Sequence, residues 1–285
     1  MTDLDPSQRE FFSPHETSRG VARARGPLIQ AEPVHTRHKA QLVAEYLRLF
    51  QHVTKHGTYI DAFAGPQEPA APETWAAKRV LELEPLWLRH FRFYDLEPAQ
   101  CELLEQLRGC YPARDITVKR ADFNIAVEAL LKNGGIDENE ATFCLLDQRT
   151  FECDWATVNK LARHKQGRKI ELFYFLANWW LDRAISGTTR NREQIRRWWG
   201  GDGWEAFIAL GRGDRPTAFA ERFRRELGYA FVNPFPIYDA QEGGRAMYYM
   251  IHAADHEEAP KFMGRAYAAV VNRLPPPPEP SLFEE

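Results

Sequence analysis

Five short apolar segments alternate with helix-like segments between residues 58 and 178, and this alternation limits the possible folds more than any other feature. The apolar segments are 58–63, 90–95, 116–122, 142–147 and 169–178. Short runs of this kind, bounded by turn residues, are typical of buried strands. Strands that alternate with helices form a parallel sheet covered on both faces. The sequence therefore predicts an α/β fold.

Two further strands follow after this order breaks. Segments 229–239 and 245–254 are apolar, and a Gln-Glu-Gly-Gly turn at 241–244 separates them. The short connection predicts an antiparallel hairpin. We therefore expect a Rossmann-like sheet of seven strands that is mostly parallel and ends in this hairpin, with a helical insert between strands five and six.

The ends of the chain differ in composition from its centre. Residues 1–30 are polar and show little periodicity, which predicts a disordered arm. Residues 275–285 begin with four prolines and predict a stiff, exposed tail. A single domain is expected over residues 31–274.

Several protein classes are disfavoured by composition. No segment approaches the roughly 18 apolar residues that a membrane span needs, and the N-terminus lacks the apolar core of a secretory signal. The four cysteines form no C-x-x-C pair, and no other pattern predicts a metal site. We expect a reduced, cytoplasmic protein, with Cys144 as a buried thiol.

Charge is concentrated in the helical insert, at about 183–229. The segment contains ten arginines, no lysines and six acidic residues, a net charge of +4, whereas the whole chain carries −3. Arginine beside tryptophan suggests contact with nucleic acid, through phosphates and stacked bases. The candidate contact residues are Arg192, Arg196, Arg197, Trp198 and Trp199. The alternative is that the paired tryptophans pack the helix onto its domain.

Acidic side chains follow four of the five parallel strands. They are Asp61, Asp95, Asp122 and Asp147. Each alone has a second interpretation, because aspartate is common in turns and at helix starts. Together they lie at the edge where an open parallel sheet binds ligands. The sequence therefore predicts a binding site at this edge.

The first two of these strands suggest a nucleoside site. Asp61 precedes Phe63-Ala64-Gly65, and the glycine would let the backbone approach a ligand closely. Asp95 ends the second strand, where an acid can accept hydrogen bonds from the two hydroxyls of a ribose. Glu97, two residues later, could do the same.

The next two acids complete the expected site. Asp122 ends the third strand, where the adenine of an adenosyl cofactor would lie, and Asp147 ends the fourth, beside the reacting group. Seven strands with this loop and these acids resemble a class I S-adenosylmethionine-dependent methyltransferase. The chain also resembles the three-Cys-motif partner protein family, TcmP. The matching segments are HTRHKAQLVAEYLRLF, TYIDAFAGP, LLDQRTFECDWATVNKLA, RRWWGGDGWEAF and MYYMIHAADHEEAPKFM, which span about His35 to Val271.

This resemblance implies a Rossmann-like fold, an S-adenosylmethionine site, a bacterial or phage origin and a protein partner with a three-Cys motif. Two segments depart from the pattern. Gln67 stands where the family loop usually has glycine, and the segment after Asp147 lacks the prolines of related amine methyltransferases. In an amine methyltransferase, Asp147 and Gln148 could hold the amine hydrogens. Phe151 could stack on a base, although a phenylalanine after a strand is more often part of the core.

Three functions stay open at this point. The first, which we favour, is a methyltransferase acting on a base amine of a nucleic acid. The second is a methyltransferase acting on a protein, such as the partner. The third is a non-catalytic module that holds a nucleotide-like ligand or a protein partner, which the two departures favour.

Overall fold

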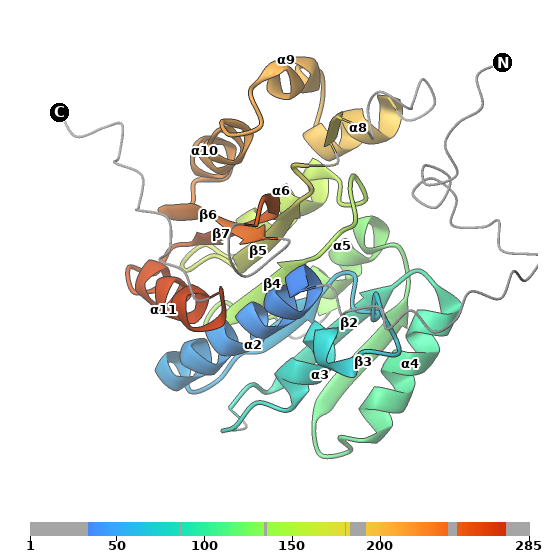
Figure 1. The fold of residues 1–285 in the computed structure, drawn as a ribbon. Helices are drawn as coiled ribbons and strands as arrows, with labels where there is room; N and C mark the ends of the chain where they lie inside the picture. Colours follow the sequence, from blue (N-terminus) through green and yellow to red (C-terminus); the bar gives the residue numbers. More distant parts are fainter. Residues whose placement is uncertain are drawn as a thin grey trace, which may run out of the picture. The chain divides into compact units, whose positions relative to one another are not determined.

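Seven strands form one sheet in the order β3-β2-β1-β4-β5-β7-β6 (Figure 1). The computed structural model describes residues 34–85, 87–133, 136–179, 181–182, 192–238 and 244–271. The strands are β1 (Thr58–Asp61), β2 (His90–Asp95), β3 (Asp115–Arg120), β4 (Thr142–Leu146), β5 (Glu171–Leu176), β6 (Phe231–Tyr238) and β7 (Ala246–Ala254).

The pairing confirms the predicted α/β sheet. β1 to β5 pair in parallel, and β7 runs antiparallel to both β5 and β6. The chain reverses direction across the sheet between β1 and β4, which is the switch point where such sheets bind ligands. The expected arm, 1–30, and the tail, 275–285, lie outside the described residues.

Helices cover both faces of the sheet. One face carries α2 (Val34–Thr54), α3 (Ala76–Leu81), α4 (Pro98–Gly109) and α11 (Ala259–Val271), with a short turn of helix, η1 (Pro72–Thr74), before α3. The other face carries α5 (Phe123–Asn133), α6 (Trp155–Arg163), α8 (Arg192–Trp199), α9 (Trp204–Ala209) and α10 (Arg215–Leu227). None of the described helices has the length and apolar character that a membrane span requires.

The strand pleat explains why both faces are buried. In β4, Phe143 and Leu145 pack under α2 and its neighbours, whereas Cys144 and Leu146 pack under α5 and α6. Successive side chains point to opposite faces of a strand, so a run without polar residues fills both layers. The prediction of a buried Cys144 thiol is confirmed.

Candidate functional site

The site expected from the sequence lies at the carboxyl edge, which we define as the sheet edge where β1, β2 and β4 end. The loop after β1 is fixed there from two sides. The Ala62 amide donates to the Leu145 carbonyl at 3.1 Å, and the Ala64 amide donates to the Tyr94 carbonyl at 2.8 Å. The Trp75 indole donates to the Ala64 carbonyl at 2.6 Å. These bonds hold the loop in one position between β2 and β4.

Gly65 and Asp95 meet at the centre of this edge. The Gly65 amide donates to Asp95 Oδ2 at 2.9 Å, and the Glu97 amide donates to Oδ1 at the same distance. A Cβ atom on Gly65 would lie 2.5 Å from Gln100 Cβ and 2.6 Å from Asp95 Oδ2, so only glycine fits. Gln67, the departure from the family loop, is exposed to solvent and leaves this close approach intact.

Asp61 lies beneath the same loop and is almost fully buried. Its carboxyl group accepts hydrogen bonds from the Tyr59 hydroxyl at 3.0 Å and from the Phe63 amide at 3.2 Å. Burial, reinforced by the negative charge of Asp147, raises the pKa of Asp61 to about 7. Asp61 can therefore gain or lose a proton near neutral pH.

Asp147 is ion-paired with Lys39, a residue that the sequence reasoning did not select. Lys39 Nζ lies 2.6 Å from Asp147 Oδ2 and 2.8 Å from Oδ1, and the two side chains are 5% and 11% exposed. The ammonium also lies 5.4 Å from the ring centre of Phe175 and 5.8 Å from that of Tyr248. The only signal in the sequence was the position of Lys39 inside the matching segment HTRHK.

The roles predicted for Gln148 and Phe151 need correction. The Gln148 amide donates to the Phe175 carbonyl at 3.2 Å and accepts from the Cys153 amide at 2.8 Å. Gln148 is 1% exposed, so both ends of its side chain serve the fold and neither faces a substrate. Phe151 is buried with its ring edge-on to Trp198, and is not available to stack on a base.

The remaining predicted cofactor residues are divided between exposed and buried positions. Glu97 is half-buried beside Asp95. Phe63 is half-buried and packs against the core beneath α5 and α6, whereas Ala64 is fully buried. Asp122 is exposed, and its carboxylate accepts from the Asn124 amide at 2.9 Å. This bond makes Asp122 the N-cap of α5.

The nucleic-acid surface predicted on α8 also needs correction, because its tryptophans pack inward. Trp198 is fully buried and stacks on Phe219 with ring centres 5.5 Å apart. Trp199 stacks on Phe207 at 4.8 Å, and the guanidinium of Arg222 lies 3.8 Å from its ring centre. The two tryptophans therefore pack the helix onto its domain, which is the alternative given for them from the sequence.

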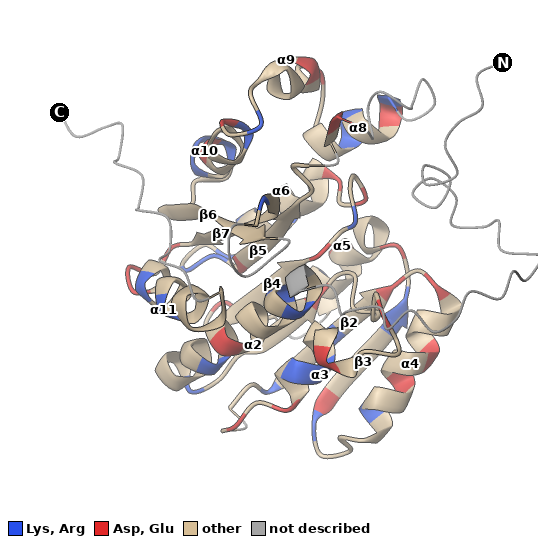
Figure 2. Ribbon diagram, viewed as in Figure 1, with Lys and Arg blue, Asp and Glu red and all other residues tan. Residues whose placement is uncertain are grey.

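The arginines of α8 are only partly free. Arg196 pairs with Asp202 at 3.1 Å, and Arg197 pairs with Asp154 at 3.4 Å, just before α6. Arg192 is exposed at the start of the helix. Figure 2 shows acidic residues interspersed with the basic ones on α8 and α10. Mixed charges and inward tryptophans make α8 a weak candidate for a nucleic-acid surface.

A different arginine–tryptophan cluster lies next to the carboxyl edge, directly after β5. The guanidinium carbons of Arg212 and Arg245 lie 4.5 Å and 4.8 Å from the ring centre of Trp179. Asn178 Nδ2 donates to the Arg212 carbonyl at 2.8 Å, and Asp182 accepts from the Arg212 side chain at 2.7 Å. The sequence signal was Asn178-Trp179 at the end of the fifth strand.

Comparisons with known proteins give distant likenesses only. No family model and no curated protein matches the sequence. The structure is similar to TYW2 from M. jannaschii in complex with AdoMet, with a TM-score of 0.40 and 8% identity over 80% of this chain and 77% of that one. It is also similar to PH0851, with a TM-score of 0.28 and 12% identity over 81% of this chain and 50% of that one. Likenesses this distant carry no functional conclusion for this chain.

Proposed function

We propose that the chain is an S-adenosylmethionine-dependent methyltransferase acting on a nucleic acid. The observation that supports this proposal is the sheet order: Asp61 and Asp147 follow β1 and β4, the two strands at the switch point, and Asp95, which accepts from the Gly65 amide, follows the neighbouring β2. Asp147 and Asp95 both contribute to the raised pKa of Asp61, so the three carboxyl groups share one electrostatic environment.

The residues at this edge fit an adenosyl group. Each carboxylate oxygen of Asp95 accepts one hydrogen bond from a backbone amide, and each can accept a second hydrogen bond. Leu96, between Asp95 and Glu97, is 62% exposed, and Ile125 in the first turn of α5 is 78% exposed. An exposed apolar side chain next to ribose acceptors suits one face of a purine, and Ile125 follows β3, the strand that pairs with β2.

Each of these residues would have a distinct role toward the cofactor. Asp95 and Glu97 would accept from the ribose hydroxyls, and the backbone at Gly65 would approach the ligand closely. Leu96 and Ile125 would keep water from the base. When bound, S-adenosylmethionine supplies an electrophilic methyl group on a sulfonium, so the protein's main task is to position the acceptor.

The acceptor side of the edge favours an anionic, aromatic substrate. The Trp179 ring suits base stacking, and the exposed Arg245 beside it provides a cation for phosphate, whereas Arg212 is paired with Asp182. Asp147 is the one predicted catalytic residue that stays at the edge, where it could accept an amine hydrogen. Lys39 Nζ now occupies a hydrogen-bonding position on this carboxylate. A base amine would therefore have to share this carboxylate with Lys39.

The pairing of Asp147 also supports a second candidate, a non-catalytic module. Lys39 bonds to both oxygens of Asp147, and Gln148 bonds to the backbone, so both predicted amine acceptors after β4 already have partners. Such a module would hold an adenosyl ligand or a protein. The resemblance to TcmP implies a three-Cys-motif protein as that partner.

Calorimetric titration with S-adenosylmethionine and S-adenosylhomocysteine tests the proposal. We expect micromolar binding that Asp95→Ala weakens by about a hundredfold, since two carboxylate hydrogen bonds to the ribose are lost. Glu102→Ala, an exposed change on α4, serves as the matched control. If the intact protein does not bind at millimolar ligand, the proposal is wrong.

Transfer of a labelled methyl group to RNA, DNA and protein then separates the candidates. Incorporation into RNA or DNA supports the proposed function, and incorporation into protein alone contradicts the nucleic-acid acceptor. Cofactor binding without transfer to any of the three supports the non-catalytic module.

A further inference from the structure

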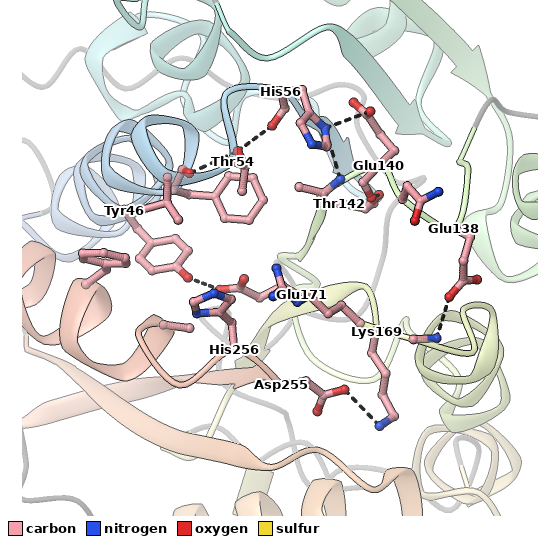
Figure 3. A pocket seen from close by; sticks show the side chains of 18 residues that line it. Tyr46, Thr54, His56, Glu138, Glu140, Thr142, Lys169, Glu171, Asp255 and His256 are labelled. Carbon is pink, nitrogen blue, oxygen red and sulfur yellow. Dashed lines mark hydrogen bonds and ion pairs between the residues drawn. The ribbon is translucent and has the colours of Figure 1, made fainter.

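A cavity of about 440 Å³ lies at the opposite edge of the sheet, away from the site described above (Figure 3). The end of α2, the starts of β4 and β5, and the segment from the end of β7 into α11 enclose it. Its volume is within the range of small-molecule sites. No residue that lines it takes part in the proposed cofactor site, so this amino-edge cavity is independent of the proposed function.

Part of the amino-edge cavity is apolar. Tyr46, Phe50 and Val53 from α2 and Phe262 from α11 line it. Val53 is 47% exposed. These side chains suit the hydrocarbon part of a ligand and the aromatic rings also favour a nearby cation.

Glu171 gives the cavity an unused acceptor. Its Oε1 atom accepts hydrogen bonds from the Tyr46 hydroxyl and from His252 Nε2. Both of these hydrogen bonds reach the same oxygen, and the side chain is 10% exposed. A carboxylate this deeply covered normally has partners on both oxygens.

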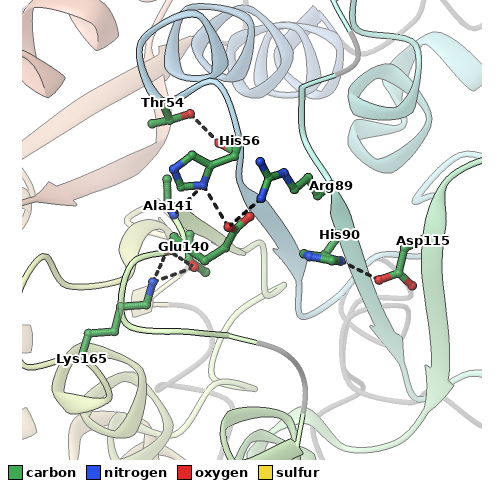
Figure 4. Close-up of polar contacts among 9 residues, drawn as sticks. Thr54, His56, Arg89, His90, Asp115, Glu140, Ala141 and Lys165 are labelled. Atoms are coloured by element: carbon green, nitrogen blue, oxygen red, sulfur yellow. Dashed lines mark hydrogen bonds and ion pairs between the residues drawn. The ribbon is translucent and has the colours of Figure 1, made fainter.

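Glu140 gives the cavity a second unused acceptor. Its Oε2 atom lies 2.9 Å from His56 Nδ1 and 3.9 Å from an Arg89 nitrogen (Figure 4). Its Oε1 atom is buried and has no hydrogen-bond partner in the described structure, and the side chain is 10% exposed. Two mostly buried carboxylates on one cavity therefore each have an oxygen left to accept a hydrogen bond.

The other charged groups of the cavity already have partners or face solvent. Glu138 accepts from the backbone amides of Gln166 and Gly167. Asp255 pairs with Lys169 at 3.1 Å. Arg168 is exposed. Four carboxylates line the cavity against two cations, Arg168 and Lys169, so the excess charge is negative and disfavours an anionic ligand.

A metal ion does not meet this need. The histidine, cysteine, aspartate and glutamate side chains in the described ranges form no group of three that could hold one. An organic cation can satisfy two separate carboxylates through several N–H donors while its stem covers apolar surface.

We propose that the amino-edge cavity binds a small organic amine or guanidine, whose N–H groups donate to Glu140 and Glu171 and whose apolar stem packs against Tyr46, Phe50 and Phe262. The site recognises positive charge and an aromatic or aliphatic stem together. Removal of either carboxylate charge weakens binding, whereas changes at the carboxyl edge leave it unaltered.

The test uses three probes of one shape on the full chain: phenethylamine, neutral 2-phenylethanol and anionic 3-phenylpropionate, titrated by ligand-observed NMR. We expect saturable binding of phenethylamine, with the other two probes at least about tenfold weaker. Equal binding of all three probes, or no binding of the amine, overturns the proposal.

Variants locate the site and separate it from the cofactor site. Glu140→Gln and Glu171→Gln should each weaken phenethylamine binding by about tenfold, a typical effect for one charge-assisted hydrogen bond. Glu138→Gln is the matched control, because this carboxylate lines the same cavity but bonds to backbone amides. Since Glu171 also bonds to Tyr46 and His252, Glu140→Gln decides the outcome if Glu171→Gln fails to fold. A loss in Glu138→Gln as large as in Glu140→Gln would show a diffuse negative surface and overturn the proposal, as would a loss in Asp95→Ala.

Discussion

Lys39 on α2 and Asp147 at the end of β4 form an ion pair across 108 residues of sequence, and the two side chains are only 5% and 11% exposed. This pair joins the first described helix to the centre of the carboxyl edge. It also neutralises the carboxylate that would have to orient an acceptor amine. Any substrate group that uses Asp147 must therefore bond to a carboxylate that already has a lysine of the same chain as its partner.

The first prediction concerns the stability that this pair contributes. Lys39→Met leaves Asp147 buried without its cation, and we expect a loss of about 3–5 kcal/mol in the free energy of unfolding. Asp147→Asn should cost a similar amount because it isolates the lysine. Chemical denaturation of both variants and of the double variant measures the coupling.

The double variant should recover most of the loss, since a neutral pair leaves no buried charge. If the two single losses simply add in the double variant, the residues do not depend on one another and the pair has no coupled role.

The second prediction concerns the close approach at Gly65. Gly65→Ala places a Cβ atom 2.5 Å from Gln100 Cβ and 2.6 Å from Asp95 Oδ2, so the loop after β1 must shift. We expect a loss of about 1–3 kcal/mol in stability and a loss of S-adenosylmethionine affinity of at least about tenfold. Calorimetry and denaturation measure the two effects.

Gly109→Ala at the end of α4 is the control, because nothing lies within 4 Å of a Cβ atom there. This variant should keep both stability and affinity. Unchanged cofactor affinity in Gly65→Ala would show that the loop after β1 does not contact the ligand.

The sheet could be predicted from the sequence because each strand has a local signal. The apolar segment 142–147 corresponds to β4, Thr142–Leu146, and the segment 90–95 matches β2. These runs are buried on both faces, so composition alone identifies them. The sequence also predicted the antiparallel hairpin, because a short turn leaves few other arrangements.

The site could be predicted only in part, because contacts between distant segments have no local signal. Asp61 and Asp95 could be predicted as site residues because they lie at the ends of strands. Lys39 lies on a helix far from Asp147 in sequence, and nothing near it indicates the pair. Likewise, Gln148 has the composition of a site residue, and only the structure shows that its amide bonds to backbone.

The third prediction concerns pH. The pKa of Asp61 is raised to about 7 by burial and by the charge of Asp147, whereas in an unfolded chain it is near 4. The folded state therefore binds the proton more tightly, and this contribution to stability is complete below about pH 4 and is lost as pH rises to about 7. Asp61→Asn removes this dependence.

The melting temperature of the Asp61→Asn variant minus that of the natural protein should therefore increase as pH rises from 5 to 8, because only the natural protein loses this contribution. The asparagine can still accept from the Phe63 amide, so the loop keeps one of its contacts. A constant difference in melting temperature across this range would contradict the raised pKa.

The fourth prediction separates packing from recognition on α8. Trp198→Ala removes a fully buried ring stacked on Phe219, and we expect a loss of about 3–5 kcal/mol in stability. Arg192→Ala, an exposed change on the same helix, should alter stability by less than about 0.5 kcal/mol. Denaturation midpoints compare the two, and a small loss for Trp198→Ala would contradict its place in the core.

The fifth prediction locates the nucleic-acid contact. If the cluster at the end of β5 binds the acceptor, Trp179→Ala should weaken binding of single-stranded RNA or DNA by about 1–3 kcal/mol through lost base stacking. Arg245→Ala should lower the dependence of affinity on salt concentration, because one phosphate contact disappears. Arg192→Ala provides the comparison on α8. Fluorescence anisotropy at two salt concentrations distinguishes the surfaces: a larger loss in Arg192→Ala than in Arg245→Ala would return the contact to α8, where the tryptophans are packed inward and only the arginines remain to reach phosphate.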